Sequence, residues 1–460
     1  MSQGSVLRAN SRLRTFLGSA GVDFLDWSVG AVERILPHAE IDPWSEIAWR
    51  ATESVWMSPQ RTEIRMTIAI GPQGEPNTRS LQTVVRRRNV PVAASKRRRT
   101  LDTREHDICL RVATRIGDVL AVAGRPSGAP SLSAIRDVFD EQIIADHLRE
   151  HHGLRLDLTD VFSAIHELAE QTYENRPLTF GAVLDPEETS DGDAPIFPRQ
   201  LFDSKKYKAL SDGFRTAYHI SSEGHLLAFV DLERFDERSL SEKNYFPQWA
   251  EHLAKASRHG RCGICLSRQG DILVFDEGTL RFTYRYGRWQ YWNHNHLLNL
   301  LKNRARSQNV LPSTIGRVVT SVYRASVDVS FRRSGGLFVV LHNRRRLAKI
   351  VRRGDELGSE DRESADKEFD NLLTGYTIQG LPRPVVVELA SLDGAVVVDN
   401  SGEVRAYGSV LQPKKRGSLK GTEGSRTKAA IGASNYGLAV KISSDGAITV
   451  YHDGEEFLGV

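Results

Sequence analysis

The stretch LDGAVVVDNSGEV, residues 392–404, predicts a strand with an unusual entry. Asp393 is followed by Gly394 and Ala395, which have minimal side chains, and then by a run of valines. Small residues let a ligand approach the backbone closely, and the carboxylate would stand at the edge of the strand. Taken alone, the pattern is also typical of an ordinary turn.

A second segment, GTEGSRTKAAIGAS at residues 421–434, predicts a helix with Ser425 as its N-cap. Arg426 and Lys428 fall in the first turn, where the helix dipole disfavours each cation by roughly a few tenths of a kcal/mol. A phosphate held by backbone N–H groups, by the hydroxyls of Thr422 or Ser425 and by both cations would remove this conflict. A helix start whose charged side chains point into water explains the residues equally well.

Strands and helices interleave on both sides of these segments. The patterns predict strands at 336–342, 347–351, 393–400, 403–408, 437–443 and 447–453, and helices at 296–308, 312–324, 360–373 and 425–434. We therefore expect residues 296–460 to form a compact α/β domain around a mixed sheet.

The preceding part of the chain predicts two further regions. Residues 1–190 are expected to be an α/β region, with helices at 23–36, 133–148 and 160–174 and strands at 63–71 and 178–184. The acidic, turn-rich segment 185–195 is the best candidate for a linker. Residues 196–293 show mainly strand patterns, and we expect a β-rich region there. Both regions are candidates for a regulatory or sensor role.

Composition and charge exclude several classes of protein. With 62 basic and 58 acidic residues the net charge is +4, too small to name a nucleic acid or a membrane as the partner. The chain has 3 cysteines, which cannot form a disulfide framework, and no apolar run approaches the roughly 20 residues of a membrane span. A cytoplasmic location is therefore expected. The sequence lacks the GxGxxG, Walker A and HExxH motifs, which leaves dinucleotide oxidoreductase, P-loop NTPase and zincin functions without support.

Taken together, the two C-terminal motifs resemble the diadenylate cyclase (DAC) family. That family carries D-G-A at a strand start and G-T-R-H-R-A-A at a helix start, which read Asp393-Gly394-Ala395 and 424–430, GSRTKAA, in this chain. SGGLFVVL at 334–341, AYGSVL at 406–411 and GLAVKISSDGAITVY at 437–451 are similar to neighbouring parts of the family's pattern. The resemblance covers about residues 296–460.

The resemblance implies an activity and a site. Two DAC protomers meet face to face, each holding one ATP, and with Mg²⁺ or Mn²⁺ they join the two ATP molecules into cyclic di-AMP and release two pyrophosphates. By motif match, Asp393 would bind the metal and activate the 3′-hydroxyl, while Gly394 and Ala395 would allow close approach of the nucleotide. The phosphates would be held by Thr422, Gly424, Ser425, Arg426, Thr427 and Lys428, with Arg426 and Lys428 also catalytic, and Leu411 would line the adenine pocket.

One departure from the family keeps an alternative open. The family's R-H-R reads Arg426-Thr427-Lys428, so the histidine is missing and one forked guanidinium is replaced by a point charge. Nucleotide binding survives this change more easily than the full catalytic rate. A degenerate domain that binds ATP or a cyclic nucleotide and signals without turnover is therefore the second hypothesis.

Other candidate sites are better explained by structure. Cys262 and Cys265 have CxxC spacing without a second ligand pair, so two partly buried cysteines in a β-rich stretch are favoured over a metal site. His294 and His296 fall where a helix is expected to begin, and His151-His152 is expected to be a solvated helix end. Solvated turns explain the basic runs at 86–88, 96–99 and 344–346 better than nucleic-acid binding does, and hairpin packing explains the aromatic residues of 284–292.

Overall fold

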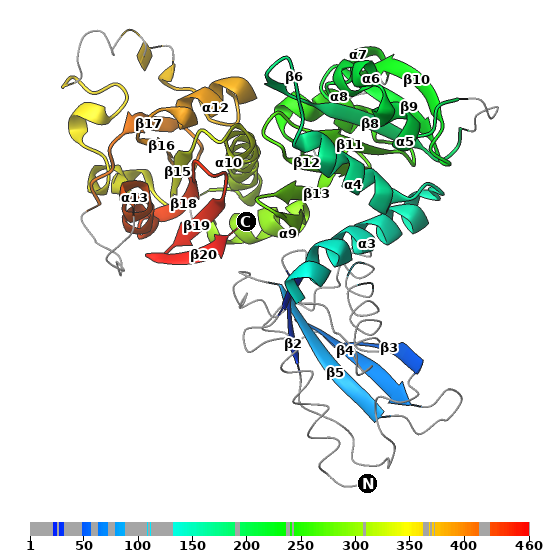
Figure 1. Ribbon diagram of the computed structural model, residues 1–460. Coiled ribbons are helices and arrows are strands. Elements are labelled where there is room, and N and C mark those ends of the chain that lie inside the picture. The colour runs from blue at the N-terminus through cyan, green and yellow to red at the C-terminus, as the bar shows by residue number, and fades with distance from the viewer. Residues whose placement is uncertain are drawn as a thin grey trace. The chain divides into compact units, whose positions relative to one another are not determined.

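A computed structural model of the chain describes two compact units (Figure 1). The described residues are five strands between 22 and 87, residues 108 and 111, and 132–459 except 189–193, 236–239, 242, 307–309, 362–367, 369, 372 and 414–423; before residue 140, side chains are described for Ile108 and Arg111 alone. One unit comprises residues 1–88, 92–244 and 249–293, and the other comprises 89–91, 245–248 and 294–460. None of the described helices combines the length and apolar character that crossing a membrane requires.

The described N-terminal strands form an antiparallel sheet. Its order is β1-β2-β5-β4-β3, with bounds β1 Val22–Phe24, β2 Trp27–Ala31, β3 Ala48–Trp56, β4 Glu63–Gly71 and β5 Arg79–Arg87. The strand expected at 63–71 is confirmed as β4, but the helix expected at 23–36 is wrong. There β1 and β2 form a tight hairpin in which Phe24 pairs with Trp27, and β2 then pairs with β5, so cross-strand pairing outweighs the local helical spacing.

A seven-stranded sheet lies at the centre of the rest of the first unit. Its order is β10-β9-β8-β11-β12-β13-β14, with bounds β8 Phe180–Asp185, β9 Thr216–Ser221, β10 Leu226–Asp231, β11 Cys262–Leu266, β12 Ile272–Asp276, β13 Thr279–Arg285 and β14 Arg288–Tyr291. The segment expected to be a linker, 185–195, lies within this unit: its first residue ends β8, and the chain then continues to β9 of the same sheet. Two short strands, β6 Thr172–Tyr173 and β7 Arg176–Pro177, form a separate hairpin.

Helices pack on both faces of this sheet. The helices are α3 Leu132–His152, α4 Leu158–Ala169, α5 Arg199–Asp203, α6 Lys205–Leu210, α7 Leu232–Phe235 and α8 Glu251–Ala256, with a 3₁₀ turn η1 Gln248–Ala250. Ile144 of α3 and Phe162 of α4 share one core with Phe180 and Ile264 of the sheet. Gly263 points to the opposite face, where Leu253 of α8 packs closely against it. The helices expected at 133–148 and 160–174 are thus confirmed, the second in its first part.

The second unit is a mixed sheet between helices. The sheet order is β17-β16-β15-β18-β19-β20, with bounds β15 Gly336–Leu341, β16 Ala395–Val398, β17 Val404–Ser409, β18 Gly437–Ile442, β19 Ile448–His452 and β20 Glu455–Gly459. Only β15 and β16 run parallel among these strand pairs. Helix α13 Ser425–Ser434 shares a core with alternate residues of β15, Leu337 and Val339, while α10 Pro312–Arg332 and α12 Arg383–Ser391 pack together and contact the same sheet (Figure 1). The mixed α/β fold class is confirmed.

Some expected elements of this unit differ from the observed ones. Residues 344–349 form a 3₁₀ helix, η2 Arg344–Lys349, so the strand expected at 347–351 is wrong; the Asn343 side chain caps that helix by accepting from the Arg345 N–H. A second 3₁₀ turn, η3 Arg353–Asp355, follows. The helix expected at 296–308 is α9 His294–Arg304. The sequence patterns missed α12 and β20, and the helix expected at 360–373 lies largely outside the described residues.

Candidate functional site

Gly394, just before β16, must be small because the backbone of β17 lies very close to it. Gly394 has φ +109°, and a methyl group added there would lie 2.6 Å from both the Gly408 carbonyl oxygen and the Ser409 nitrogen of β17. Ala395, the first residue of β16, pairs with Ser409 and is buried in the core under α13. Gly394 is thus required by strand packing, while the Asp393 side chain before it is fully exposed.

The N-terminus of α13 is fixed by packing of the rest of the helix. Gly424 is the N-cap residue and Ser425 the first helical residue, so the expectation that Ser425 is the cap is wrong. Ala430, Ile431 and Ala433 are buried against β15 and β18, which holds the first turn at the edge of the domain core. The first N–H groups of a helix have no acceptor within it, so this turn offers donors and a positive dipole end.

A cleft of about 1050 Å³ joins the two segments. Of the residues singled out from the sequence, Asp393, Gly394, Leu411 and all of 424–428 line it. Ala395 lies in the core and is not among the lining residues, and Thr422 lies outside the described residues. Two motifs about thirty residues apart in sequence therefore face one cavity that is large enough for a nucleotide.

Arg426 and Asp393 face each other in this cleft. Nη2 of Arg426 lies 3.8 Å from Oδ1 of Asp393. Because the carboxylate is exposed, this loose pair stabilises the fold little, and either group can turn to a ligand at small cost. The guanidinium also lies against the backbone of Gly335, where a methyl group would meet Nη1 at 2.5 Å.

Sequence reasoning missed part of the lining. Lys441 of β18, Ser443 and Ser444 beyond it, and Ser409 of β17 all face the cleft. Lys441 adds a third cation to Arg426 and Lys428, so three basic side chains line the cleft. The sequence did contain a signal for Lys441, because it is a single charged residue in the apolar strand GLAVKI, whose other residues are buried.

The other candidates from the sequence have structural explanations. Cys262 and Cys265 are both buried, and residues three apart on a strand point to opposite faces, so they do not form one site. Their burial raises the pKa of both thiols, which keeps them protonated. His294 begins α9 and its Nδ1 lies 2.7 Å from the Tyr323 hydroxyl, while the side chain of His296 is outside the described part.

The aromatic hairpin and one of the basic runs also lie among the described residues. Trp289 and Tyr291 of the β13–β14 hairpin are buried, as hairpin packing predicts. Arg344, Arg345 and Arg346 are exposed on η2. For the runs at 86–88 and 96–99, side chains lie outside the described residues.

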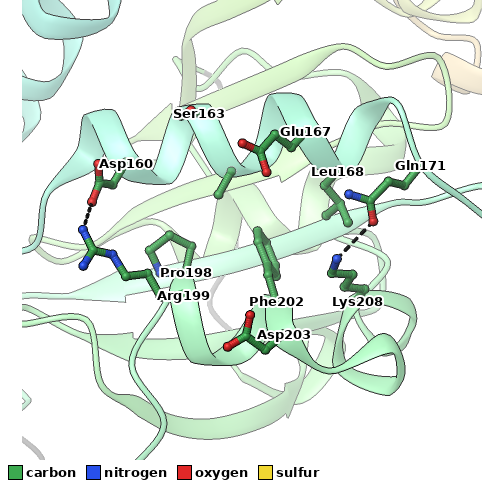
Figure 2. A pocket seen from close by; sticks show the side chains of 11 residues that line it. Asp160, Ser163, Glu167, Leu168, Gln171, Pro198, Arg199, Phe202, Asp203 and Lys208 are labelled. Carbon is green, nitrogen blue, oxygen red and sulfur yellow. Dashed lines mark hydrogen bonds and ion pairs between the residues drawn. The ribbon is translucent and has the colours of Figure 1, made fainter.

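A smaller cleft of about 400 Å³ lies in the first unit between α4 and the α5–α6 segment. Figure 2 shows one ion pair and one hydrogen bond at its two ends: Nη2 of Arg199 donates to Oδ2 of Asp160 at 2.7 Å, and Lys208 donates to Gln171 at 3.1 Å. Leu168 and Phe202 lie between these pairs. This arrangement stabilises the contact between the helices and indicates no particular ligand.

Comparisons with known proteins gave results of different weight. No curated protein matches the chain. Solved structures similar to it include a hypothetical membrane spanning protein from Bacillus cereus, at 21% identity and TM-score 0.23, covering 36% of this chain and 74% of that one. Another is a double cysteine mutant of DacA from Staphylococcus aureus, at 20% identity and TM-score 0.21, covering 30% of this chain and 84% of that one. These TM-scores are low and carry no functional argument.

The match to a family model is more informative. The model DAC, described as the DisA bacterial checkpoint controller nucleotide-binding family, matches residues 324–456. This range contains β15 to β19 and α13, and with them every described residue that the sequence suggested for the site. Residues 324–456 of this chain are therefore similar to the nucleotide-binding domain of the DAC family.

Proposed function

We propose that this chain is a diadenylate cyclase-like nucleotidyltransferase that condenses two ATP molecules into cyclic di-AMP and two pyrophosphates. The observation that carries the proposal is the single cleft shared by the Asp393 carboxylate and the basic helix start at 424–428. A triphosphate is complementary to this cleft, because Arg426, Lys428 and Lys441 supply positive charge and the first turn of α13 supplies N–H donors.

Each group has a part in this reaction. Arg426 forms forked hydrogen bonds to phosphate, and Lys428 and Lys441 neutralise charge that builds up on the α-phosphate and on pyrophosphate as it leaves. The exposed Asp393 carboxylate lies beside the nucleotide and can take up the proton of the attacking 3′-hydroxyl. Buried Leu411 provides an apolar surface for the adenine ring.

The residues present also fit a divalent cation. Mg²⁺ and Mn²⁺ take oxygen ligands and are commonly bound by one or two carboxylates together with substrate phosphates. Asp393 would be the protein ligand, and the ion would supply charge neutralisation on the phosphates. Since one cleft holds one ATP, joining two requires two clefts that face each other, so we propose that a second copy of the domain is the partner.

Product analysis tests the proposal. Purified protein incubated with ATP and Mn²⁺ should yield cyclic di-AMP, and Asp393→Asn should abolish it. Glu388→Gln is the matched control, because Glu388 is an exposed carboxylate on α12 that pairs with Arg332 and does not line the cleft. Failure of the wild type to form a cyclic dinucleotide contradicts catalysis, and equal turnover by Asp393→Asn contradicts the role proposed for Asp393.

A second candidate is a domain that binds a nucleotide without turnover. Thr427, which stands where the DAC motif has histidine, lines the cleft and supplies a hydroxyl but no charge. ATP binding detected by calorimetry, together with no product detected by mass spectrometry, would favour this candidate. The N-terminal regions would then act on a nucleotide sensor and not on an enzyme.

A further inference from the structure

Three side chains with metal-binding atoms meet where α3 ends against the sheet of the first unit. His151 and His152 are the last residues of α3, and Asp276 is the last residue of β12. One donor atom from each lies within 4.8 Å of the other two. His152 and Asp276 are buried and His151 is exposed, so the expectation of a solvated helix end at 151–152 is wrong for His152.

A hydrogen bond to the backbone fixes the orientation of the His152 ring. Its Nδ1 lies 2.6 Å from the carbonyl oxygen of Gly260, and because a carbonyl can only accept, Nδ1 carries the hydrogen. In the neutral ring the lone pair is then on Nε2, which lies 3.2 Å from Oδ1 of Asp276. A lone pair and a carboxylate oxygen repel each other at this distance unless a cation lies between them.

The spacing of the two atoms fits a shared metal ion. The buried Nε2 of His152 makes no hydrogen bond to any described residue. Two ligands on a tetrahedral Zn²⁺, with metal–ligand distances of about 2.0–2.2 Å, are separated by about 3.3 Å. The observed 3.2 Å between Nε2 and Oδ1 fits such a pair.

Neighbouring groups hold two of the three proposed ligands in place. The Gly260 carbonyl orients His152, and Nε of Arg281 lies 3.7 Å from Oδ2, the other oxygen of Asp276. Partners of this kind hold ligands in place in many metal sites. Neighbouring side chains on a helix usually diverge, yet the His151 ring is turned edge-on to that of His152, with centroids 5.1 Å apart.

The structure also indicates which ion fits. Cys262 pairs with Asp276 across β11 and β12, but its sulfur is not among the donor atoms that lie within 4.8 Å of one another. The donor set is therefore two imidazole nitrogens and one carboxylate oxygen, which favours Zn²⁺ and similar transition metals over Mg²⁺ or Ca²⁺. Exposure of His151 leaves a route for the ion and for a water ligand.

We propose that His151, His152 and Asp276 bind one divalent transition-metal ion of the Zn²⁺ class, which ties the end of α3 to the sheet. This site is separate from the cleft of the DAC domain and does not depend on the proposed activity. A second group, Asp185, Glu188 and His219, fits less well, because Nε2 of His219 already forms a hydrogen bond with Oδ2 of Asp185 at 3.1 Å.

Zn²⁺ binding to the full chain tests the site. The protein carries Asp393→Asn, which removes the carboxylate proposed for the ATP-bound ion, and is stripped with a chelator. Equilibrium dialysis should then find one tightly bound Zn²⁺ that excess Mg²⁺ does not displace, and Zn²⁺ should raise Tm. His151→Ala should weaken binding about tenfold or more and remove the Tm increase, without loss of fold because the side chain is exposed.

Glu188→Ala is the matched control, since it removes an exposed ligand from the neighbouring group. It should leave both Zn²⁺ binding and the Tm increase unchanged. Absence of tight Zn²⁺ binding, equal binding by His151→Ala, or loss of binding in Glu188→Ala alone would each overturn the proposal.

Discussion

The guanidinium of Arg426 lies directly against the backbone of Gly335, so that a methyl group on Gly335 would approach Nη1 to 2.5 Å. Gly335 precedes β15 and has φ +70°, a conformation that glycine adopts readily. The start of the central strand therefore sets where the first cation of α13 can lie, and with it the width of the space between Arg426 and Asp393.

This contact predicts the effect of Gly335→Ala. The new methyl group should displace the guanidinium and raise KM for ATP about tenfold or more, because a charge-assisted hydrogen bond to phosphate is lost. Gly358→Ala is the control: it imposes a similar backbone strain at φ +76° but meets no atom within 4 Å. Both variants should lose about 1 kcal/mol of stability. Steady-state kinetics in which both variants share one KM would contradict the role given to Gly335.

Gly394→Ala should destabilise the domain itself. Its methyl group would meet the backbone of β17, which cannot move aside as a flexible side chain can, and φ is +109°. We expect the free energy of unfolding to fall by about 2–4 kcal/mol, measured with urea. Gly375→Ala, at φ +82° in open space, should cost about 1 kcal/mol. Equal losses would mean that β16 and β17 separate more easily than their packing indicates.

The buried carboxylate of Asp399 should make the stability of the protein depend on pH. Burial acts to raise the pKa of Asp399, but hydrogen bonds from the Ser401 hydroxyl and from Arg405 outweigh it, and the pKa lies below the usual 3.8. The stabilisation is therefore complete above the unfolded-state pKa and is lost as pH falls through the lower folded-state pKa. Unfolding curves should show declining stability below about pH 4.

Asp399→Asn should lower stability at pH 7 by about 1–3 kcal/mol and reduce this pH dependence. Asp361→Asn removes an exposed partner of Arg353 and should change stability by less than about 1 kcal/mol. If Asp399→Asn keeps the acid dependence of the wild type, the carboxylate between β16 and β17 is not its source.

We expect the substitution Thr427→His to increase the rate of catalysis. Restoring the imidazole of the DAC motif to the cleft adds a donor that can carry charge in the transition state, so kcat for cyclic dinucleotide formation should rise, by about tenfold if one charge-assisted hydrogen bond is gained. ATP affinity should change much less. An unchanged kcat, measured by chromatography of the products, would show that threonine serves this reaction as well as histidine.

What could be predicted from the sequence was mostly local. Helix α13 was predicted with its observed bounds, 425–434, because an alanine-rich segment follows a glycine. The hairpin at 22–31 and the burial of His152 were not predicted, because each depends on distant partners, β5 in one case and Gly260 and Asp276 in the other. Similarly, the need for Gly394 comes from Gly408, which approaches only when β16 and β17 pair.

The most direct measurement of the central claim is titration of the protein with an ATP analogue that cannot be cyclised, by calorimetry. Arg426→Gln should weaken binding about tenfold or more, since the guanidinium contacts phosphate in the cleft, whereas Arg332→Gln, an exposed cation paired with Glu388 outside the cleft, should bind as the wild type does. Equal affinities for all three proteins would contradict the assignment of the cleft to the triphosphate.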